Sequence, residues 1–479
     1  MNRVDPEILF SNQPFAAEIL ARLQDRGYDA YVVGGSVRDI LLSKIRQSFN
    51  IDPEKLDVDI ATDASIDEIK SIFRDQKIIE VGARFGVLIV IGPGGKQYEI
   101  AHFREEKNYD GRKPERVDKT DSLQKDVERR DFTINGLAMK KNGRIIDYVR
   151  GIEDLKSNII RAIGNPERRF NEDLLRSLRA IRFACSLNAK IERKTFSAIK
   201  KVANRITEIS WERIREEFFK ILEADCSSKG MKLMLQTGLL HQVLPELTAS
   251  MGVQQPEKYH PEGDVFQHSL QALEKADVLK FSPLVKFAVL LHDVGKEKAQ
   301  KKNEGEHTGG HSLIGSKMAR TISERFRLSN EEKERLCWLI ENHMRGAAFP
   351  KMNRAKQVRM VRTRQNEEES IDKIPDRFSY FADLLRVIIA DSEASVHRSD
   401  GWLPVLEEVT DLLPHIRELE LGESAREMID GNDLKEMGMK EGPALGEVLH
   451  QIHRKILGGQ IKSRKEALNE AEKTLETQD

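Results

Sequence analysis

The sequence predicts an α+β protein, in which a small mixed-sheet head precedes an all-helical neck, body and tail. Runs of β-branched and apolar residues with period-2 alternation are concentrated in the first third of the chain, as in half-buried strands. After Gly164 this alternation stops, and apolar residues recur at spacings of three and four up to the C-terminus. That spacing is typical of amphipathic helices.

Length and composition set the limits for this architecture. The chain has 479 residues, which predicts about three domains at roughly 100–200 residues each. Its 78 Lys and Arg and 79 Asp and Glu give a formal net charge of −1, so any nucleic-acid surface must be a local patch. Three scattered cysteines, the absence of a signal-like N-terminus and the lack of an apolar run of about 18 residues predict a cytoplasmic protein.

The head is expected to contain six short strands separated by glycine-rich or charged turns. They cover residues 31–33, 58–60, 86–91, 97–103, 137–139 and 144–148. The polar, turn-rich segment 105–125 between them is predicted to be a surface loop. Later boundaries are expected near residues 252–263 and 400–404, where glycine and proline interrupt the helical pattern.

A pair of glycines follows the first predicted strand. Gly34 and Gly35 precede an apolar, helix-like run that contains Arg38. Glycines let the backbone approach a phosphate closely, and a helix N-terminus adds donors for it. Arg38 lies one turn into the helix and can bind a phosphate through two hydrogen bonds. An ordinary turn is the alternative interpretation.

Three carboxylates are expected on neighbouring strands of the head. Asp57 and Asp59 are two residues apart, so on one strand they point to the same face. Glu99 lies on a later strand and can face them. Two adjacent carboxylates repel each other unless cations lie between them, and two Mg²⁺ ions carrying a nucleoside triphosphate would meet this need. A solvated edge strand is the alternative.

These motifs, followed by Arg129-Arg130-Asp131-Phe132-Thr133-Ile134-Asn135, resemble the class II tRNA nucleotidyltransferase and bacterial poly(A) polymerase family. The resemblance covers roughly residues 28–225. It implies that Asp57 and Asp59 hold two Mg²⁺ ions and that Glu99 belongs to the catalytic set. It also implies a nucleotide-binding set made of Gly34, Gly35, Arg38, Arg130, Asp131, Asn135, Asp173, Arg176, Arg179 and Arg182.

Asp173 and Arg176 suggest how a base is chosen without a template. Three residues apart on a helix, they would share a face. A carboxylate acceptor beside a guanidinium donor can then copy the Watson–Crick edge of a nucleobase and accept C or A. Arg179 and Arg182 continue the spacing and would reach the triphosphate. The alternative is an ordinary ion pair between Asp173 and Arg176. The run 212–219 resembles the helix that supports this nucleotide helix in the family.

Six of the twelve histidines lie between residues 260 and 343, and some accompany a His-Asp doublet. The order of these residues resembles the HD phosphohydrolase superfamily. It implies that His268, His292, Asp293 and Asp391 bind one divalent metal, while His311 and His343 allow a second one bridged by Asp293. Imidazole-rich ligand sets favour transition metals such as Mn²⁺, Co²⁺ or Ni²⁺. Lys296 is a candidate phosphate partner, His260 and His307 have no assigned role, and a degenerate HD fold kept for packing is the alternative.

The last 80 residues resemble the C-terminal helical region of long, HD-bearing tRNA nucleotidyltransferases. His450, His453, Arg454 and Lys455 are either a solvated helix face or phosphate contacts to RNA. The predicted domains are a nucleotidyltransferase head (1–160), a helical neck and body (161–255), an HD domain (256–400) and a tRNA-binding tail (401–479).

The resemblance implies template-independent addition of CMP and AMP to the 3′ end of tRNA, with ATP, CTP and the tRNA acceptor arm as partners. An additional phosphohydrolase activity of the HD domain is part of this prediction. Addition of A alone, or of poly(A), remains an alternative because these activities share the motifs. The alternatives from other classes are a metal-dependent phosphohydrolase whose head only binds RNA, and a catalytically silent RNA-binding module.

Overall fold

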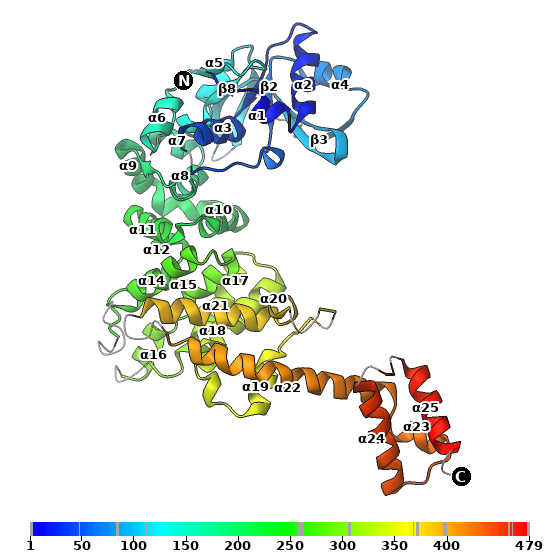
Figure 1. The fold of residues 1–479 in the computed structure, drawn as a ribbon. Helices are drawn as coiled ribbons and strands as arrows, with labels where there is room; N and C mark the ends of the chain where they lie inside the picture. The colour runs from blue at the N-terminus through cyan, green and yellow to red at the C-terminus, as the bar shows by residue number, and fades with distance from the viewer. Residues whose placement is uncertain are drawn as a thin grey trace. The chain divides into compact units, whose positions relative to one another are not determined.

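The computed structural model describes residues 3–46, 48–82, 86–110, 113–255, 263–304, 308–366, 368–369, 373–395, 400–457, 460–461 and 463–476. It contains two compact units, Met1–Glu257 with Glu262–Cys337 and Lys258–Pro261 with Trp338–Asp479. The predicted fold class is confirmed, because a mixed sheet forms the N-terminal head and helices form most of the rest (Figure 1). In the part described, no helix is long and apolar enough to cross a membrane.

A seven-stranded sheet forms the head, in the order β3-β4-β5-β2-β1-β8-β9. All six expected strands are present: β1 (Ala30–Val33), β2 (Asp59–Thr62), β4 (Val87–Ile91), β5 (Gln97–His102), β8 (Leu137–Met139) and β9 (Ile145–Asp147). β1 pairs antiparallel with β2 and β8, whereas β2 runs parallel to β5. The ends of β1, β2 and β5 therefore come together at the centre of the sheet.

Parts of the head differ from the prediction. β3 (Lys77–Gly82) is an additional edge strand. The segment 105–125 is not a loop, because β6 (Arg104–Asp110) and β7 (Lys113–Lys119) form a hairpin and α5 (Leu123–Glu128) follows it. The hairpin sequence is mostly polar, with Tyr109 and Val117 among the exceptions, so it lacks the apolar alternation from which a strand is usually recognised.

One core cluster joins α5 to the sheet. Tyr31 and Val33 of β1, together with Phe103, pack against Leu123 and Val127 of α5. The helix α3 (Gly35–Ile45) begins directly after β1 and packs on β1 and β8. Because the Arg-Arg-Asp run follows α5 directly, with Arg129 as the C-cap of the helix, this core fixes that run against the sheet.

Helices continue the first unit after the head. They include α7 (Pro166–Glu172), α8 (Leu175–Ser186), α10 (Trp211–Glu223), α11 (Ser227–Thr237), α14 (Val265–Val278), α15 (Pro283–Leu291) and α17 (His311–Arg325). Phe218, Phe287 and Phe326 pack in a cluster with ring centroids 5.2–5.6 Å apart. A fully buried ion pair, Lys286 with Asp277 at 2.8 Å, joins α15 to α14. The division into units falls within α18 (Asn330–Ala347).

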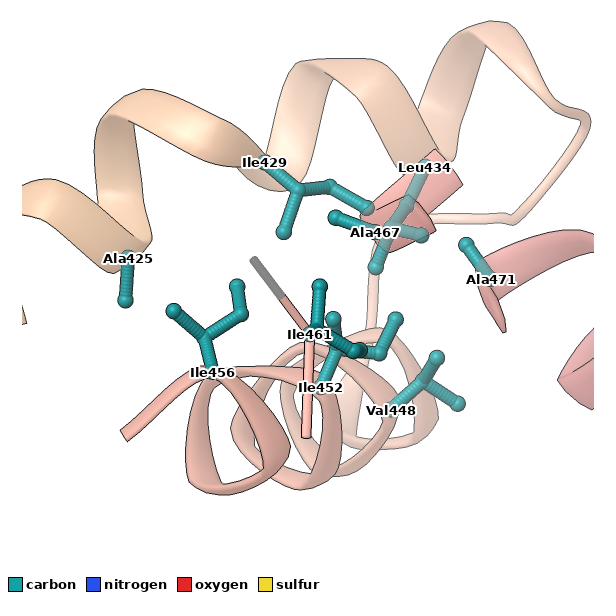
Figure 2. Packing of buried hydrophobic residues seen from close by; sticks show 9 residues of the cluster. All are labelled: Ala425, Ile429, Leu434, Val448, Ile452, Ile456, Ile461, Ala467 and Ala471. Atoms are coloured by element: carbon teal, nitrogen blue, oxygen red, sulfur yellow. The ribbon is translucent and has the colours of Figure 1, made fainter. Parts of the chain in front are cut away.

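The second unit ends in a small helical tail with its own core. α24 (Pro443–Leu457) carries Val448, Ile452 and Ile456 at spacings of four, so they lie on one face. Figure 2 shows these residues pointing toward Ile429 at the end of α22 (Leu403–Met428) and toward Ala467 of α25 (Arg464–Glu476). Leu434 of α23 (Gly431–Glu436) completes this buried cluster.

Candidate functional site

The carboxylates of the head meet at the ends of its central strands. Asp59 is the first residue of β2, opposite Val33 of β1 and beside Glu99 of β5. Asp57 precedes β2 and is exposed. β2 begins only at Asp59, so Asp57 lies just before the strand, and the expectation that both carboxylates share one face stays a prediction. Their charges nevertheless act on one another, as the pKa shifts of the cluster show.

Burial, together with the charges of Glu99 and Asp57, raises the pKa of Asp59 from 3.8 to about 7, while Arg130 opposes this rise. Burial and Asp57 also raise the pKa of Glu99, against Arg104, Arg130 and Arg129. The nearby arginines therefore do not fully compensate the three carboxylates. Such a set of oxygen donors with surplus negative charge suits hard divalent cations.

Gly34 fits this site because of its backbone and the space beside it. Its φ of +79° lies in the left-handed region, and it forms the N-cap of α3. A Cβ placed there would lie 3.3 Å from Nη1 of Arg130 and 3.5 Å from Oδ2 of Asp59. Gly35 begins α3, and a Cβ on it would lie 3.7 Å from Nη2 of Arg38. The predicted glycine turn thus adjoins both the carboxylates and two arginines.

A chain of hydrogen bonds extends from α3 to α8. Arg38 donates from Nη1 to Oδ1 of Asn135 at 2.8 Å, and Asn135 donates to Oδ1 of Asp131 at 3.0 Å. Arg179 donates to Oδ2 of Asp131 at 2.9 and 2.6 Å. Burial would raise the pKa of Asp131, but Arg179 and Asn135 lower it to about 2. Asp131 is therefore an anion that orients two predicted nucleotide-binding side chains.

Three of the predicted arginines surround one aromatic ring. The guanidinium carbons of Arg38, Arg179 and Arg182 lie 5.1, 5.5 and 4.3 Å from the ring centre of Phe183. Burial lowers the pKa of Arg182, and Glu217 of α10 opposes this from 3.0 Å. Glu217 lies in the run expected to support the nucleotide helix. The sequence analysis missed Phe183, whose only signal was its place among arginines at helical spacing.

Asp173 and Arg176 do not share a helix face as expected. Asp173 has extended backbone angles (φ −148°, ψ 104°) between α7 and α8, and Arg213 of α10 lies 3.7 Å from its carboxylate. Arg176 instead pairs with Glu172 at 3.1 Å. The Asp173 carboxylate also accepts the N–H of Leu175, two residues into the turn. This hydrogen bond spans the break between α7, which ends at Glu172, and α8, which begins at Leu175, so Asp173 and Arg176 do not belong to one helix.

A cavity of about 260 Å³ lies beside Asp173. Its polar lining consists of Asn171, Asp173, Arg205, Glu208, Ser210 and Arg213. Arg176 is not part of this lining. The structure therefore brings Asp173 to a cavity and leaves Arg176 beside the Arg-Arg-Asp run, where it donates to the carbonyl oxygen of Arg129 at 3.3 Å.

Asp126 of α5 is a site residue that the sequence analysis did not identify. It is almost fully buried and accepts from Arg129 at 2.7 Å and from Arg130 at 3.2 Å. Its Oδ1 also accepts the backbone N–H of Arg104 at 3.3 Å. Burial would raise the pKa of Asp126, but Arg129 and Arg130 lower it. One buried anion thus holds both arginines of the Arg-Arg-Asp run.

A second group of predicted residues lies in the helical part of the first unit. His292 caps α15, Asp293 follows it, and His311 begins α17. The Nε2 atoms of His292 and His311 both lie 3.2 Å from carboxylate oxygens of Asp293. The ring of His268 on α14 lies 5.4 Å, centre to centre, from that of His292. All four residues are buried.

The tautomers of these histidines are suited to metal binding. Nδ1 of His292 lies 2.7 Å from the carbonyl oxygen of Val289, and Nδ1 of His311 lies 2.9 Å from that of Thr308. A carbonyl only accepts, so each Nδ1 carries a proton, and Nε2 is the ring atom that faces Asp293 and that a metal would displace a proton from or bind directly. Histidine ligands of metals typically have this arrangement. Burial would raise the pKa of Asp293, but His292 and Lys296 hold it well below its usual value.

Gly295, which the sequence did not single out, allows the backbone after Asp293 to approach the start of α17 closely. A Cβ there would lie 2.1 Å from the carbonyl oxygen of His311. Lys296, expected as a phosphate partner, instead lies 2.5 Å from both Asp293 and Gln255. His343 on α18 and Asp391 on α21 (Ser379–Ala394) belong to the second unit, and their part in the site stays a prediction. His260 and His307 lie outside the described residues.

The tail residues singled out in the sequence divide into two pairs. His453 contacts the carbonyl oxygen of Ile429 through Nε2 at 2.9 Å, and Lys455 lies 2.5 Å from Glu470. His450 and Arg454 are exposed. Two of the four side chains therefore serve the packing of the tail, and the predicted RNA contact stays untested.

Four family models match successive parts of the chain. They are the "Poly A polymerase head domain" over residues 30–161, the "Probable RNA and SrmB- binding site of polymerase A" over 188–251, the "HD domain" over 265–385 and domain 2 of tRNA nucleotidyltransferases over 407–471. The carboxylates and Arg-Arg-Asp run lie in the first match, and the His-Asp doublet lies in the third.

Curated and solved relatives resemble the whole chain or about half of it. The CCA-adding enzyme of Ligilactobacillus salivarius is 32% identical over 463 residues, which are 96% of each chain. That of Lactobacillus helveticus is 44% identical over 246 residues, and this match spans 51% of the present chain and 58% of the relative. The Bacillus stearothermophilus CCA-adding enzyme in complex with CTP is 25% identical, with a TM-score of 0.56 over 98% of this chain and 99% of the other. The Thermotoga maritima CCA-adding enzyme complexed with tRNA is 21% identical, with a TM-score of 0.55 over 99% and 97%, and shares the fold.

Proposed function

The chain belongs to the CCA-adding enzymes, class II tRNA nucleotidyltransferases with a poly(A) polymerase head, an RNA-binding region and an HD domain, and we propose that it adds CMP and AMP to the 3′ end of tRNA at the strand ends of its head. The observation that carries this assignment is the cluster of Asp57, Asp59 and Glu99 beside the glycine turn and Arg130. The substrates would be CTP, ATP and the acceptor arm of tRNA.

The carboxylates fit a pair of Mg²⁺ ions. Asp57 and Asp59 would hold them, because oxygen ligands with surplus negative charge are what Mg²⁺ prefers. When bound, the ions would supply charge stabilisation for the triphosphate and a lowered pKa for the attacking hydroxyl. Glu99 would complete the negative edge of this site.

The remaining residues would bind and orient the nucleotide. Arg38, Arg179 and Arg182, held around Phe183, offer a cationic surface for the triphosphate. Asp173 and Arg176 would select the base, from separate positions rather than as one pair. In the reaction, the RNA 3′-oxygen bonds to the α-phosphorus, the bond from that phosphorus to the bridging oxygen breaks, and pyrophosphate leaves.

The HD domain would carry a second activity. His268, His292, Asp293 and His311 would bind divalent transition metal, with His343 and Asp391 as further ligands, and the site would hydrolyse phosphate esters. The hydrogen bonds from Nδ1 of His292 and His311 to backbone carbonyls support metal binding, because they orient each ring with Nε2 as the ligand atom. This activity is proposed second to nucleotide addition, because none of the described residues indicates which phosphate ester the HD domain would hydrolyse.

The addition reaction is tested with tRNA ending at the discriminator base, at C, at CC and at CCA, each with CTP or ATP alone. The wild-type protein should add C to the first two and A to the third. Asp59→Asn and Asp57→Asn should each lower turnover at least 10²-fold, because such charge-stabilising groups normally contribute that much. Asp67→Asn, an exposed carboxylate on α4 (Ile66–Ile72), is the matched control.

Other outcomes would contradict the proposal. Extension only of the CC end would assign A-adding activity, and repeated A addition would assign poly(A) polymerase activity. Retention of more than about a tenth of wild-type turnover by Asp59→Asn would show that this carboxylate does not carry the reaction.

A further inference from the structure

The second unit contains a stretch with an unusual charge distribution. From Asn342 to Asn366, the sequence holds seven Lys and Arg and no Asp or Glu. The whole chain has a net charge of −1, so this excess is local. The nucleotide site described above does not use these residues. The structure around these residues therefore has to show what this local positive charge could bind.

α19 (Arg354–Val361) lies at the centre of this stretch. Asn353 caps the helix by accepting the N–H of Lys356 at 3.0 Å. Gln357, Met360 and Val361 are buried, whereas Arg354 and Arg359 are exposed. The helix thus presents arginines to solvent on the side away from its packed face.

A groove of about 900 Å³ runs between α19 and α22. It is lined by Arg354, Arg359, Arg362 and Arg364 from the first segment and by His415 and Leu419 from α22. Among the residues that the structure describes, no carboxylate lines this groove. From Arg354 to Arg362 the backbone extends over about 12 Å at 1.5 Å per residue. This length exceeds that of a single phosphate group.

The structure leaves part of this positive charge uncompensated. Arg354 pairs with Glu408 at 2.8 Å. Arg364 lies 5.2 Å above the ring of Tyr380 and donates to its hydroxyl at 2.8 Å, which adds no negative charge. Arg359 has no carboxylate of the described residues within ion-pair distance. An extended anion would therefore find two adjacent arginines with available charge.

We propose that this groove between α19 and α22 binds the phosphate backbone of the tRNA substrate. The inference rests on the proposed function, which supplies a polyanion as substrate. Arginines along a groove without carboxylates match successive phosphates, to which guanidinium groups donate paired hydrogen bonds. Contacts of this kind position RNA and contribute affinity, but they read no sequence.

The test uses the full chain with Arg359→Gln, Arg364→Gln and the double substitution. Binding of tRNA is measured by fluorescence anisotropy between 50 and 200 mM salt (roughly the range where counterion release is resolved). Each substitution should weaken binding about fivefold. It should also reduce the slope of log affinity against log salt by about 0.7–0.9, because binding releases fewer counterions when one phosphate contact is lost. Lys356→Gln, which removes the same charge from the same helix outside the groove, is the control.

The outcomes separate this proposal from the proposed function. Turnover of the double variant at saturating tRNA should stay at the wild-type level, since the groove positions RNA and holds no reacting group. Equal affinities and salt slopes for the double variant and Lys356→Gln would overturn the groove assignment, and an acidic protein segment would then be the better partner. Failure of the wild-type protein to extend tRNA would instead overturn the proposed function.

Discussion

The largely buried carboxylate of Asp59 lowers the stability of the folded protein, and the proposed binding of metal ions requires this carboxylate at that position. Its pKa is about 7 in the folded protein and 3.8 in an exposed carboxyl. A raised pKa means that the folded state binds the proton more tightly, so stability present below pH 4 is lost as the pH rises through 7. The ionised side chain beside Glu99 and Asp57 therefore destabilises the metal-free head at neutral pH and above.

Asp59→Asn should consequently stabilise the protein in EDTA while abolishing nucleotide addition. We expect a gain of about 1–3 kcal/mol at pH 8, since each unit of pKa shift corresponds to about 1.4 kcal/mol and neighbouring carboxylates share the strain. The gain should be smaller at pH 5, where the wild-type carboxyl is protonated. Thermal unfolding at both pH values measures it. Asp67→Asn should show no such difference, and equal midpoints for wild type and Asp59→Asn at pH 8 would refute the assigned shift.

At the scale of one element, α5 positions the arginines of the Arg-Arg-Asp run. Its apolar residues Leu123 and Val127 pack on the sheet, and its buried Asp126 binds Arg129 and Arg130. Arg130 in turn acts on the charges of Asp59 and Glu99. A short helix thus connects the core of the head to the electrostatics of its site.

Asp126→Asn should lower the turnover of nucleotide addition at least tenfold, because small displacements of positioning groups cost this much or more. Stability should fall by about 1–3 kcal/mol from the weakened buried hydrogen bonds. Asp277→Asn controls for stability alone, since it weakens the buried pair with Lys286 outside the head. Turnover is compared at a temperature well below both unfolding midpoints. Equal turnover of the two variants would assign Asp126 a purely structural role.

The elements also show what could be predicted from sequence. Strands with one buried face, such as β4 and β5, were predicted because alternation reports burial directly. The β6–β7 hairpin has no apolar face and carried no such signal. At the site, Asp131 and Arg179 were both predicted to belong to the nucleotide-binding set, yet their mutual ion pair depends on packing between segments 48 residues apart. The same holds for Asp173, whose partner Arg213 is set by the approach of α10 rather than by helical spacing.

At the scale of the whole molecule, the chain contains two ligand sets of different chemistry. The head offers carboxylates, which suit Mg²⁺. The HD domain offers imidazoles around Asp293, and such sets bind transition metals more tightly. The two sets share no residue. Their activities should therefore respond independently to substitution and to the metal supplied.

His292→Ala combined with Asp293→Ala should abolish hydrolysis of terminal or 2′,3′-cyclic phosphates while leaving nucleotide addition within a few-fold of wild type. Mn²⁺, Co²⁺ or Ni²⁺ should support the hydrolysis far better than Mg²⁺, whereas Mg²⁺ should suffice for addition. Phosphate release and tRNA extension are assayed in parallel with each metal. His241→Ala, an exposed histidine on α12 (Leu239–Val243), should change neither activity. If no metal supports hydrolysis that the double substitution removes, the buried histidines serve packing, and the second activity does not exist in this chain.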